Sequence, residues 1–384
     1  MIGFIVSTTS GLDVKKKIVS LAVNLGFDIV KITTAEPFSE DSATAIDSIR
    51  KGYMDGMPWY NENRVWRASD PEKLLPGAKS IIVVAMSYLP EEHFDESESG
   101  KGKVARYAQW QDYHVVMKRK LKMLSDSLDV LAEVSSVNRI FVDDGSFMER
   151  AAARRAGVGW FGKNSNILTA EHGSWVFLGA LITDLDLEPD ESLRKNCGSC
   201  VTCLIECPTG AIVSPYIIDA KRCISYLTIE NRGPIPIELR PAIGNWVFGC
   251  DICQEVCPVN RDVSGSSDAD LKPKMVSSLE LIPLLSLTQE EFSSRFKNRP
   301  IKRAKLEGLK RNACVALGNA KHISAVSALG RVLLEDTNIV KQHAAWALGR
   351  IGGMSAKSIL SQALATESDH DVQREIILAI DSIA

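Results

Sequence analysis

The cysteines constrain this chain more than any other feature of its sequence. Residues 197–208 read CGSCVTCLIECP, so four cysteines recur with the spacing CxxCxxCxxxC and a proline follows the last one. This spacing is typical of bacterial ferredoxins, whose thiolates hold 4Fe-4S clusters. A second run, CDICQEVCP at 250–258, has the spacing CxxCxxxC and again ends in Cys-Pro. The two runs together predict a two-cluster iron–sulfur segment.

A ligand set follows from the same spacing. Two 4Fe-4S clusters need eight thiolates, and in a two-cluster ferredoxin the fourth cysteine of a run ligates the other cluster. The isolated Cys223 supplies the thiolate that the second run lacks. We therefore expect one cluster on Cys197, Cys200, Cys203 and Cys257, and the other on Cys207, Cys223, Cys250 and Cys253.

Two other uses of cysteine fit the pattern less well. Structural zinc sites use CxxC pairs, but they require neither the triple spacing nor a repeated Cys-Pro. A disulfide framework goes with secretion, and the apolar stretch at residues 2–6 is too short for a signal peptide. The ninth cysteine, Cys314, lies on a helical apolar pattern, where we expect it to be a buried hydrophobic side chain.

Composition describes what surrounds the clusters. With 384 residues, of which 45% are hydrophobic and 24% charged, the chain has the composition of a globular protein of two or three domains. No apolar run is long enough to span a bilayer, so we expect no membrane partner and a cytoplasmic location. The net charge of -3 argues against a globally basic nucleic-acid binder. Residues 295–311 nevertheless carry eight Lys or Arg residues against one Glu, either as a solvated face or as a phosphate-binding surface.

The C-terminal part contains an internal repeat. NACVALGNA at 312–320 is followed 31 residues later by HAAWALGRI at 343–351, and REIILAIDSI at 374–383 is a degenerate third copy. Further apolar patterns lie between the copies, so each unit consists of two short predicted helices. This pattern predicts a HEAT-like stack that presents one surface to a partner. A plain helical subdomain is the alternative.

The first half alternates between helical and strand patterns, which predicts an α/β domain: a sheet flanked by helices, with a ligand crevice at the strand ends. The predicted helices cover 14–25 and 113–131, and the predicted strands cover 27–32, 80–86, 139–142 and 175–182.

Two short motifs in this half do not support the functions they suggest. GxGxxG at 157–162 follows a helical pattern at 149–156, whereas a dinucleotide fingerprint must follow a strand. Asp112, Tyr113 and His114 begin a pattern like the DxHxxG that supplies a cobalt ligand in some cobalamin proteins, but Met117 stands where glycine is needed. We therefore expect His114 to be a polar residue on a helix.

Asp143 follows the predicted strand 139–142 and precedes Gly145 and a helix expected to begin near Ser146. Such an acid can serve as the N-cap of the helix. It can also act as a general acid, if a nearby buried cofactor keeps its carboxyl group protonated. The residues alone leave both interpretations open.

Several of these motifs, taken in order, resemble the epoxyqueuosine reductase family. The motifs are Arg67 with Asp70-Pro71, LLPGAKSI at 74–81, DYH at 112–114, VDDG at 142–145, ERAAARRAGVGWFGKN at 149–164, GSW at 173–175, both ferredoxin runs and the HEAT-like tail. The resemblance covers nearly the whole chain. This family uses cobalamin and iron–sulfur clusters to reduce epoxyqueuosine to queuosine at the wobble position of tRNA.

The resemblance implies an organisation and a set of partners. Residues 1–188 would form a nitroreductase-like α/β domain that holds cobalamin, with a fold similar to that of the reductive dehalogenases. Residues 189–265 would form a ferredoxin-like domain, and 266–384 a linker and the HEAT-like repeats. The implied partners are tRNA carrying epoxyqueuosine and a low-potential electron donor, and we expect a monomer.

The resemblance also assigns roles residue by residue. Asp143 matches the family's proton donor. The implied cobalamin contacts are Arg67, Asp143, Lys163, Asn164, Ser165, Asn166, Leu178 and Ser225. The implied tRNA contacts are Arg150, Arg232, Arg240, Lys302, Arg303, Lys310 and Arg311.

Two other functions compete with the tRNA reductase. A cobalamin reductase acting on a small molecule would have no use for the basic run or the HEAT-like tail. A non-catalytic electron carrier with a docking tail would not need the α/β half.

Overall fold

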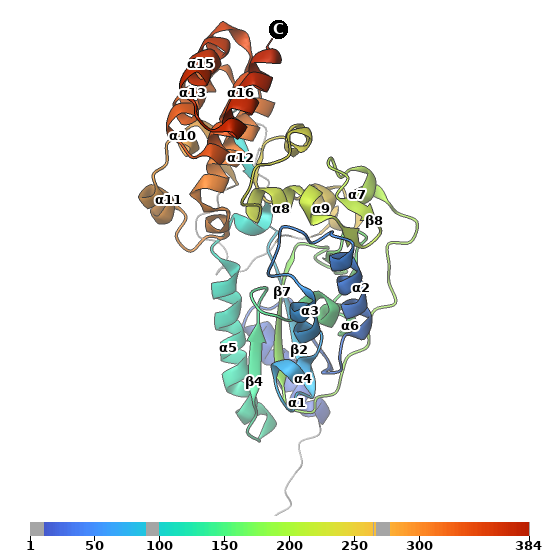
Figure 1. Cartoon of the computed structure of the whole chain (residues 1–384). Coiled ribbons are helices and arrows are strands. Elements are labelled where there is room, and N and C mark those ends of the chain that lie inside the picture. Colours follow the sequence, from blue (N-terminus) through green and yellow to red (C-terminus); the bar gives the residue numbers. More distant parts are fainter. Residues whose placement is uncertain (1–10, 90–99, 264, 266–276, 384) are drawn as a thin grey trace, which may run out of the picture.

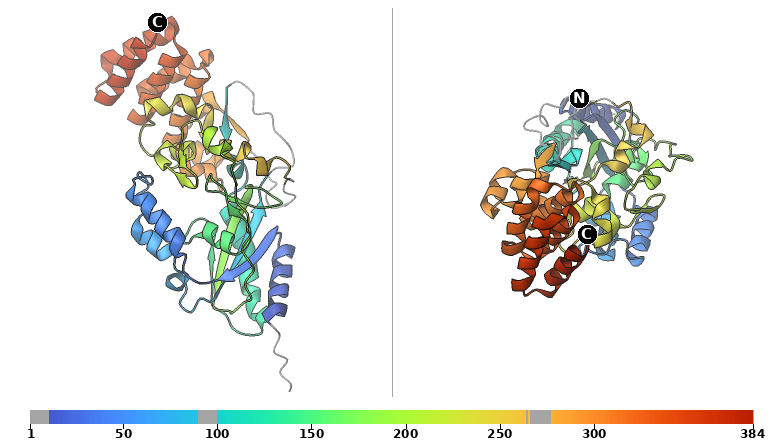
Figure 2. Two further views of the ribbon diagram at one scale, coloured as in Figure 1. Left: turned by 90° about the vertical axis from the view of Figure 1, so that its right-hand side faces the viewer. Right: turned by 90° about the horizontal axis from the view of Figure 1, so that it is seen from above.

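The computed structural model describes residues 11–89, 100–263, 265 and 277–383. The apolar stretch at 2–6 and most of the start of the predicted linker lie outside these residues. The α/β domain and a stack of helices lie at opposite ends of an elongated molecule, with the cysteine-rich segment between them (Figures 1 and 2). Within the described ranges, no helix is long and apolar enough to cross a membrane.

The α/β domain is built on a four-stranded sheet with the order β1-β2-β7-β4. Its strands are β1 (Ile29–Thr34), β2 (Ser80–Ser87), β7 (Val176–Thr183) and β4 (Asn138–Phe141). All neighbours are antiparallel, so the rule that places ligands at the carboxyl ends of parallel strands does not apply. The loop that leaves β4 matters instead, because it carries Asp143.

Helices cover both faces of this sheet, as the sequence predicts. β2 is buried along its whole length. α1 (Gly11–Asn24) and α5 (Tyr113–Ala132) pack against one face, while α4 (Pro71–Leu74) and α6 (Glu149–Arg155) pack against the other. The sequence of β2 therefore does not alternate between apolar and polar residues, because a strand covered on both faces buries the side chains at every position.

The GxGxxG and DYH motifs of this domain have structural roles. The Asp112 side chain caps α5 by accepting the backbone N–H of His114 at 3.1 Å. Gly157 adopts φ +78° just after α6, and a Cβ there would lie 2.2 Å from the carbonyl oxygen of Glu191. Neither motif needs a ligand to explain it.

The C-terminal helices form the predicted HEAT-like stack. They are α12 (Lys305–Asn319), α13 (Val326–Glu335), α14 (Asn338–Ile351), α15 (Gly353–Thr366) and α16 (His370–Asp381), preceded by α10 (Leu281–Leu285) and α11 (Gln289–Arg295). The repeated glycines let the helices approach each other closely. A Cβ on Gly318 would lie 2.9 Å from the Cα of Ala347, and one on Gly349 would lie 2.8 Å from the Cα of Ala379.

The cysteine-rich segment contains short elements. They are α7 (Thr202–Ile205), β8 (Ile212–Ser214), β9 (Ile217–Ile218), α8 (Ile224–Ile229) and α9 (Ile252–Glu255). Of these, α7 and α9 each include one cysteine. A separate sheet of order β10-β3-β11 joins distant parts of the chain: β3 (Lys101–Val104), β10 (Trp246–Phe248) and β11 (Ser278–Glu280). Residues such as Ile224 and Phe248 share one hydrophobic core with the C-terminal helices. The predicted domain limits at 188/189 and 265/266 stay a prediction.

Candidate active site

The seven cysteines of the two runs and the isolated Cys223 lie in two neighbouring groups. All are free thiols and partly exposed, whereas Cys314 is buried, as predicted. Burial is the largest cause of a raised pKa of about 11 for the Cys203 thiol, and the charges of three neighbouring cysteines also contribute. The first group consists of Cys203 and these three neighbours: Cys197, Cys257 and Cys200. The second group is identified in the same way. Burial and the charges of Cys223 and Cys207 raise the pKa of the Cys250 thiol. Burial and the charges of Cys223 and Cys250 raise the pKa of the Cys253 thiol. The second group therefore consists of Cys207, Cys223, Cys250 and Cys253.

Four soft sulfur donors per group are the chemistry that an iron–sulfur cluster requires. The donor sets therefore fit two clusters. The groups adjoin each other, because Cys203 also contributes to the raised pKa of Cys253.

The second group borders a cluster of acids and tyrosines. Asp251, which is 2% exposed, precedes α9 and accepts the backbone N–H of Arg106 at 2.7 Å. Tyr107 lies close to Asp251. Burial raises the pKa of the Tyr107 phenol, and the charges of Asp143 and Asp251 also contribute to this rise. Tyr107 therefore lies within electrostatic reach of two acids: Asp251, which is next to Cys250, and Asp143, the predicted proton donor.

The Asp143 loop is held in an unusual conformation. Asp143 adopts φ +52°, a left-handed conformation that costs a non-glycine residue about 1 kcal/mol or more. Its exposed carboxylate accepts the hydroxyl of Tyr113 at 2.6 Å. The N-cap residue of α6 is Met148, which makes no side-chain cap bond. The interpretation of Asp143 as the N-cap of this helix is therefore wrong, because its carboxyl group is bonded to Tyr113 instead.

Side chains from three elements hold the rest of this loop. Arg64, from α3 (Glu62–Ala68), donates from Nη2 to the carbonyl oxygen of Gly145 at 2.6 Å. Lys118, from α5, pairs with Asp144. Glu149, from the first turn of α6, accepts the backbone N–H of Asp143 at 3.1 Å.

Sequence reasoning missed Tyr107, Tyr113 and Glu149. The Tyr113 ring stacks on Phe177 with a centroid distance of 4.2 Å, and burial raises the pKa of its phenol. The phenol therefore stays a hydrogen-bond donor. Burial, with a smaller contribution from the charge of Asp143, raises the pKa of Glu149 to about 7. The only sign of Glu149 in the sequence is an acid six residues after Asp143. This spacing alone does not distinguish it from any other acid in the first turn of a helix.

The loop predicted to contact cobalamin joins the two parts of the site. Lys163 donates to the carbonyl oxygen of Gly198 at 2.8 Å, and Asn164 donates to that of Cys253 at 3.1 Å. The Ser165 hydroxyl donates to the carbonyl oxygen of Tyr216 at 2.9 Å. This loop therefore lies between the α/β domain and both cysteine groups.

The other residues in the predicted cobalamin set lie on separate elements. Arg67 is exposed on α3, Leu178 is half-buried in β7, and Ser225 is half-buried in α8. Asn166 follows Ser165 in the joining loop, where its backbone N–H donates to the side chain of Asn164 at 3.2 Å.

Two of the predicted tRNA contacts are wrong, because the structure buries them. Arg240 is 1% exposed and makes two bonds to Glu375, at 3.0 and 2.7 Å. Arg311 is also 1% exposed, and it donates to the carbonyl oxygens of Asn231, Gly233 and Leu227. Burial lowers the pKa of the Arg311 guanidinium to about 10. Both arginines join the cysteine-rich segment to the helical stack.

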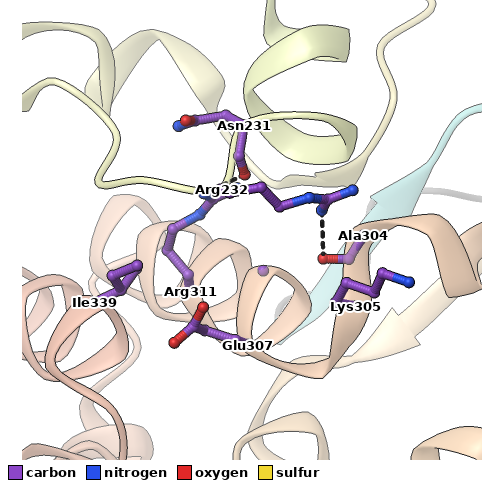
Figure 3. Close-up of a pocket in the computed structure, with 8 residues that line it drawn as sticks. Asn231, Arg232, Ala304, Lys305, Glu307, Arg311 and Ile339 are labelled. Carbon is purple, nitrogen blue, oxygen red and sulfur yellow. Dashed lines mark hydrogen bonds between the residues drawn. The ribbon is translucent and has the colours of Figure 1, made fainter. Parts of the chain in front are cut away.

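Two other residues of the predicted tRNA set, Lys310 and Arg232, already have partners within the protein. Lys310 is half-buried and pairs with Asp336 at 2.7 Å. Arg232 is exposed, but it donates to the carbonyl oxygen of Ala304 (Figure 3) and also to that of Arg303. A cavity of about 50 Å³ beside it, lined partly by Arg311 and Lys305, has room for water rather than for a nucleotide (Figure 3).

Besides Arg232, three of the predicted tRNA contacts are exposed. Lys302 and Arg303 lie just before α12, and Arg150 lies on α6, where it donates to the carbonyl oxygen of Ser165 at 2.8 Å. The guanidinium of Arg303 pairs with Glu230, which raises its pKa, and the charges of Asp143 and Tyr107 contribute further. Arg303, in the middle of the basic run, therefore lies within electrostatic reach of Asp143.

This fold and site define an iron–sulfur protein in which an acidic loop of an α/β domain lies next to a double cluster segment and a helical repeat scaffold. Residues 196–260 match the 4Fe-4S double cluster binding domain, and residues 303–381 match HEAT repeats. Residues 68–144 match the family described as Epoxyqueuosine reductase QueG, DUF1730.

Whole-chain relatives agree with these matches. The epoxyqueuosine reductase of Bacillus cereus is 34% identical over 96% of this chain and 97% of its own length. That of Escherichia coli (strain K12) is 39% identical over 87% of this chain and 89% of its own length. The chain belongs to the epoxyqueuosine reductase family.

Solved structures show the same fold. An epoxyqueuosine reductase with an epoxyqueuosine-modified tRNA-Tyr stem loop superposes with a TM-score of 0.91 at 34% identity, covering 97% of this chain and all of that one. The enzyme from Bacillus subtilis, with its catalytic Asp loop swung out of the active site, also gives a TM-score of 0.91 at 34% identity, covering 98% of this chain and 100% of that one.

Proposed function

We propose that this protein is an epoxyqueuosine reductase that converts epoxyqueuosine to queuosine at the wobble position of tRNA. One observation carries the proposal: Asp143 is exposed on a strained loop and bonded to Tyr113, whose ring lies 6.3 Å from that of Tyr107, and Tyr107 lies within electrostatic reach of Asp251, the residue next to Cys250. Removing an epoxide oxygen as water takes two electrons and two protons, so an acid close to an electron-transfer centre is the required arrangement.

The cofactors would occupy the places that their donors define. The two cysteine groups would hold one 4Fe-4S cluster each, with the ligand sets predicted from spacing. Cobalamin would lie where Lys163, Asn164 and Ser165 join the α/β domain to the cysteine-rich segment. The support for this placement is that these three side chains donate to backbone carbonyl oxygens of the cysteine-rich segment, so the loop lies where the two parts of the chain meet. When bound, cobalamin would supply the low-potential reduction that breaks the carbon–oxygen bond of the epoxide.

The protein's own residues would control the proton. Asp143 donates a proton to the epoxide oxygen as negative charge develops there. The Tyr113 hydroxyl holds the carboxyl group through the 2.6 Å bond to Oδ2, and stacking on Phe177 fixes the ring. Because Asp143 is exposed, water can return a proton to it after each turnover.

The exposed cations would hold the RNA. Arg303 lies within electrostatic reach of Asp143, and Lys302 is exposed next to it in the sequence. An anticodon loop offers phosphates to these cations and an unpaired base to the acid. Turning a loop base out of its stack costs less than extracting one from a duplex. The stem–loop complex of the related enzyme supports this substrate, and a tRNA substrate favours a cytoplasmic protein.

The partners on the electron side follow from the chemistry. The clusters would need a low-potential one-electron donor, and we expect the protein to work as a monomer.

An Asp143→Asn variant tests the proposal. The amide keeps the shape of the side chain but cannot donate an acidic proton, so conversion of an epoxyqueuosine stem–loop should fall at least ~100-fold. Cluster and cobalamin absorbance and stem–loop affinity should match the unmodified protein. Full conversion by this variant would remove Asp143 from the chemistry, and conversion of a small halogenated substrate in place of the stem–loop would favour the small-molecule reductase.

A further inference from the structure

Asp143 needs an anchor that the proposed chemistry does not itself supply. Its left-handed backbone at φ +52° is unfavourable for an aspartate, so surrounding contacts must hold it. Tyr113 holds the carboxyl group, and Glu149 holds the backbone by accepting the N–H of Asp143 at 3.1 Å. The two contacts act on different parts of one residue, and the Glu149 contact acts on the part that is strained.

Glu149 is fixed in place by its helix. It begins α6, whose residues Ala151, Ala152 and Ala153 are at most 3% exposed and pack in the core beneath the sheet. On the opposite side of the helix, Arg154 donates from Nη2 to Asp41 at 2.9 Å. The carboxyl group therefore reaches the Asp143 loop from a rigid base.

The position of Glu149 has no evident benefit for folding. A glutamate in the first turn of a helix usually faces solvent, where the helix dipole favours it. Here burial raises the pKa of the carboxyl group to about 7, so its ionised form costs folding free energy at neutral pH. The charged residues that act on Glu149 are Asp143 and Arg150. Two further cations hold the next residues of the loop: Arg64 bonds to Gly145, and Lys118 pairs with Asp144.

We propose that Glu149 is a positioning residue that keeps the Asp143 carboxyl group in the site by accepting the backbone N–H of Asp143 and stabilising its left-handed conformation. This inference rests on the proposed function. Loss of the bond lets the loop relax to an ordinary conformation, which moves the proton donor away from the substrate. A related enzyme has been solved with its catalytic Asp loop swung out, so a loop of this kind can occupy two positions.

Three variants test the proposal in the protein loaded with clusters and cobalamin. Glu149→Ala removes the acceptor, and Glu149→Gln keeps an amide oxygen that can accept the same N–H. Asp41→Ala is the matched control, because it removes a partner of α6 without touching the loop. The substrate is an anticodon stem–loop carrying epoxyqueuosine, and kcat, KM and stem–loop affinity are measured for each.

We expect Glu149→Ala to lower kcat about 10- to 100-fold, the range for losing a hydrogen bond to a charged acceptor, with KM and affinity changed less than about threefold. Glu149→Gln should recover most of kcat, and Asp41→Ala should leave it unchanged. Hydrogen exchange should be faster at residues 142–146 in Glu149→Ala than in either other variant.

Two results would overturn the inference. One is an unchanged kcat in Glu149→Ala. The other is a loss in Glu149→Ala that Glu149→Gln does not recover, with loop exchange unchanged. Either result leaves the proposed function intact provided that the unmodified protein converts the stem–loop. Failure of the unmodified protein to convert it would instead count against the proposed function.

Discussion

The buried pair between Arg240 and Glu375 should stabilise the fold without contributing to RNA binding. Glu375, on α16, is 5% exposed at its side chain, and its two oxygens lie 3.0 and 2.7 Å from the two terminal nitrogens of the Arg240 guanidinium. Arg240 also donates from Nε to the carbonyl oxygen of Ile235 at 2.9 Å. The pair therefore links the last repeat helix to the cysteine-rich segment.

Glu375→Ala leaves the guanidinium buried without its counter-charge. Breaking a buried ion pair in this way costs about 3–5 kcal/mol, because the remaining charge is neither solvated nor neutralised. Replacing both residues, as Arg240→Met with Glu375→Leu, removes both charges and should recover most of that loss. Arg374→Ala is the matched control on the same helix: Arg374 pairs with Asp371 at 3.6 Å, both side chains are 69% exposed, and such pairs are worth about 0.5 kcal/mol or less.

Urea denaturation followed by circular dichroism measures these differences in the free energy of unfolding. Affinity for an anticodon stem–loop, measured under native conditions, should be the same in all the variants. Equal stability of Glu375→Ala and Arg374→Ala would refute the account of the buried pair. A selective loss of stem–loop affinity in the stable double variant would restore Arg240 as an RNA contact.

Three further predictions follow from the site and its surroundings. Tyr113→Phe removes the hydroxyl that Asp143 accepts, so kcat for the stem–loop should fall about tenfold with affinity unchanged, and an unaltered kcat would show that the bond does not matter. Lys302→Ala with Arg303→Ala should weaken stem–loop binding and flatten its dependence on salt, measured by fluorescence anisotropy from about 50 to about 200 mM salt, whereas an unchanged slope would place the RNA elsewhere. Burial lowers the pKa of His343 well below its usual value, and its Nε2 accepts the N–H of Ile235 at 3.0 Å. The folded state then binds fewer protons than the unfolded chain, so the free energy of unfolding should be highest above about pH 6.5 and decrease as pH falls, and His343→Gln should lessen this decrease.

The features that the sequence predicts well are those with a strict spacing. The interval between thiolates is set by cluster geometry, and the repeat interval in the C-terminal helices is set by stacking, so both are visible in one dimension. The repeated glycines at 318 and 349 also follow from stacking, because a Cβ at either position would collide with the backbone of the neighbouring helix. The sheet and its covering helices were predictable from apolar patterns.

The features that the sequence does not reveal depend on which partner a side chain meets. Arg240 and Lys302 are both basic residues of the predicted tRNA set, yet Arg240 pairs with Glu375 from 135 positions away and Lys302 is exposed to solvent. Glu149 similarly resembles any acid in a first helical turn until the left-handed loop brings the Asp143 N–H to it. The antiparallel order of the sheet is likewise a property of long connections rather than of the strands themselves.

The most direct test is a mass-spectrometric assay of the modified base. The protein, reconstituted anaerobically with both clusters and cobalamin, is incubated with a strong reductant and tRNA carrying epoxyqueuosine, and the nucleosides are then digested and analysed. The account predicts loss of one oxygen atom from epoxyqueuosine, dependent on cobalamin and on both clusters. No loss of oxygen in a protein confirmed to hold all three cofactors would contradict it.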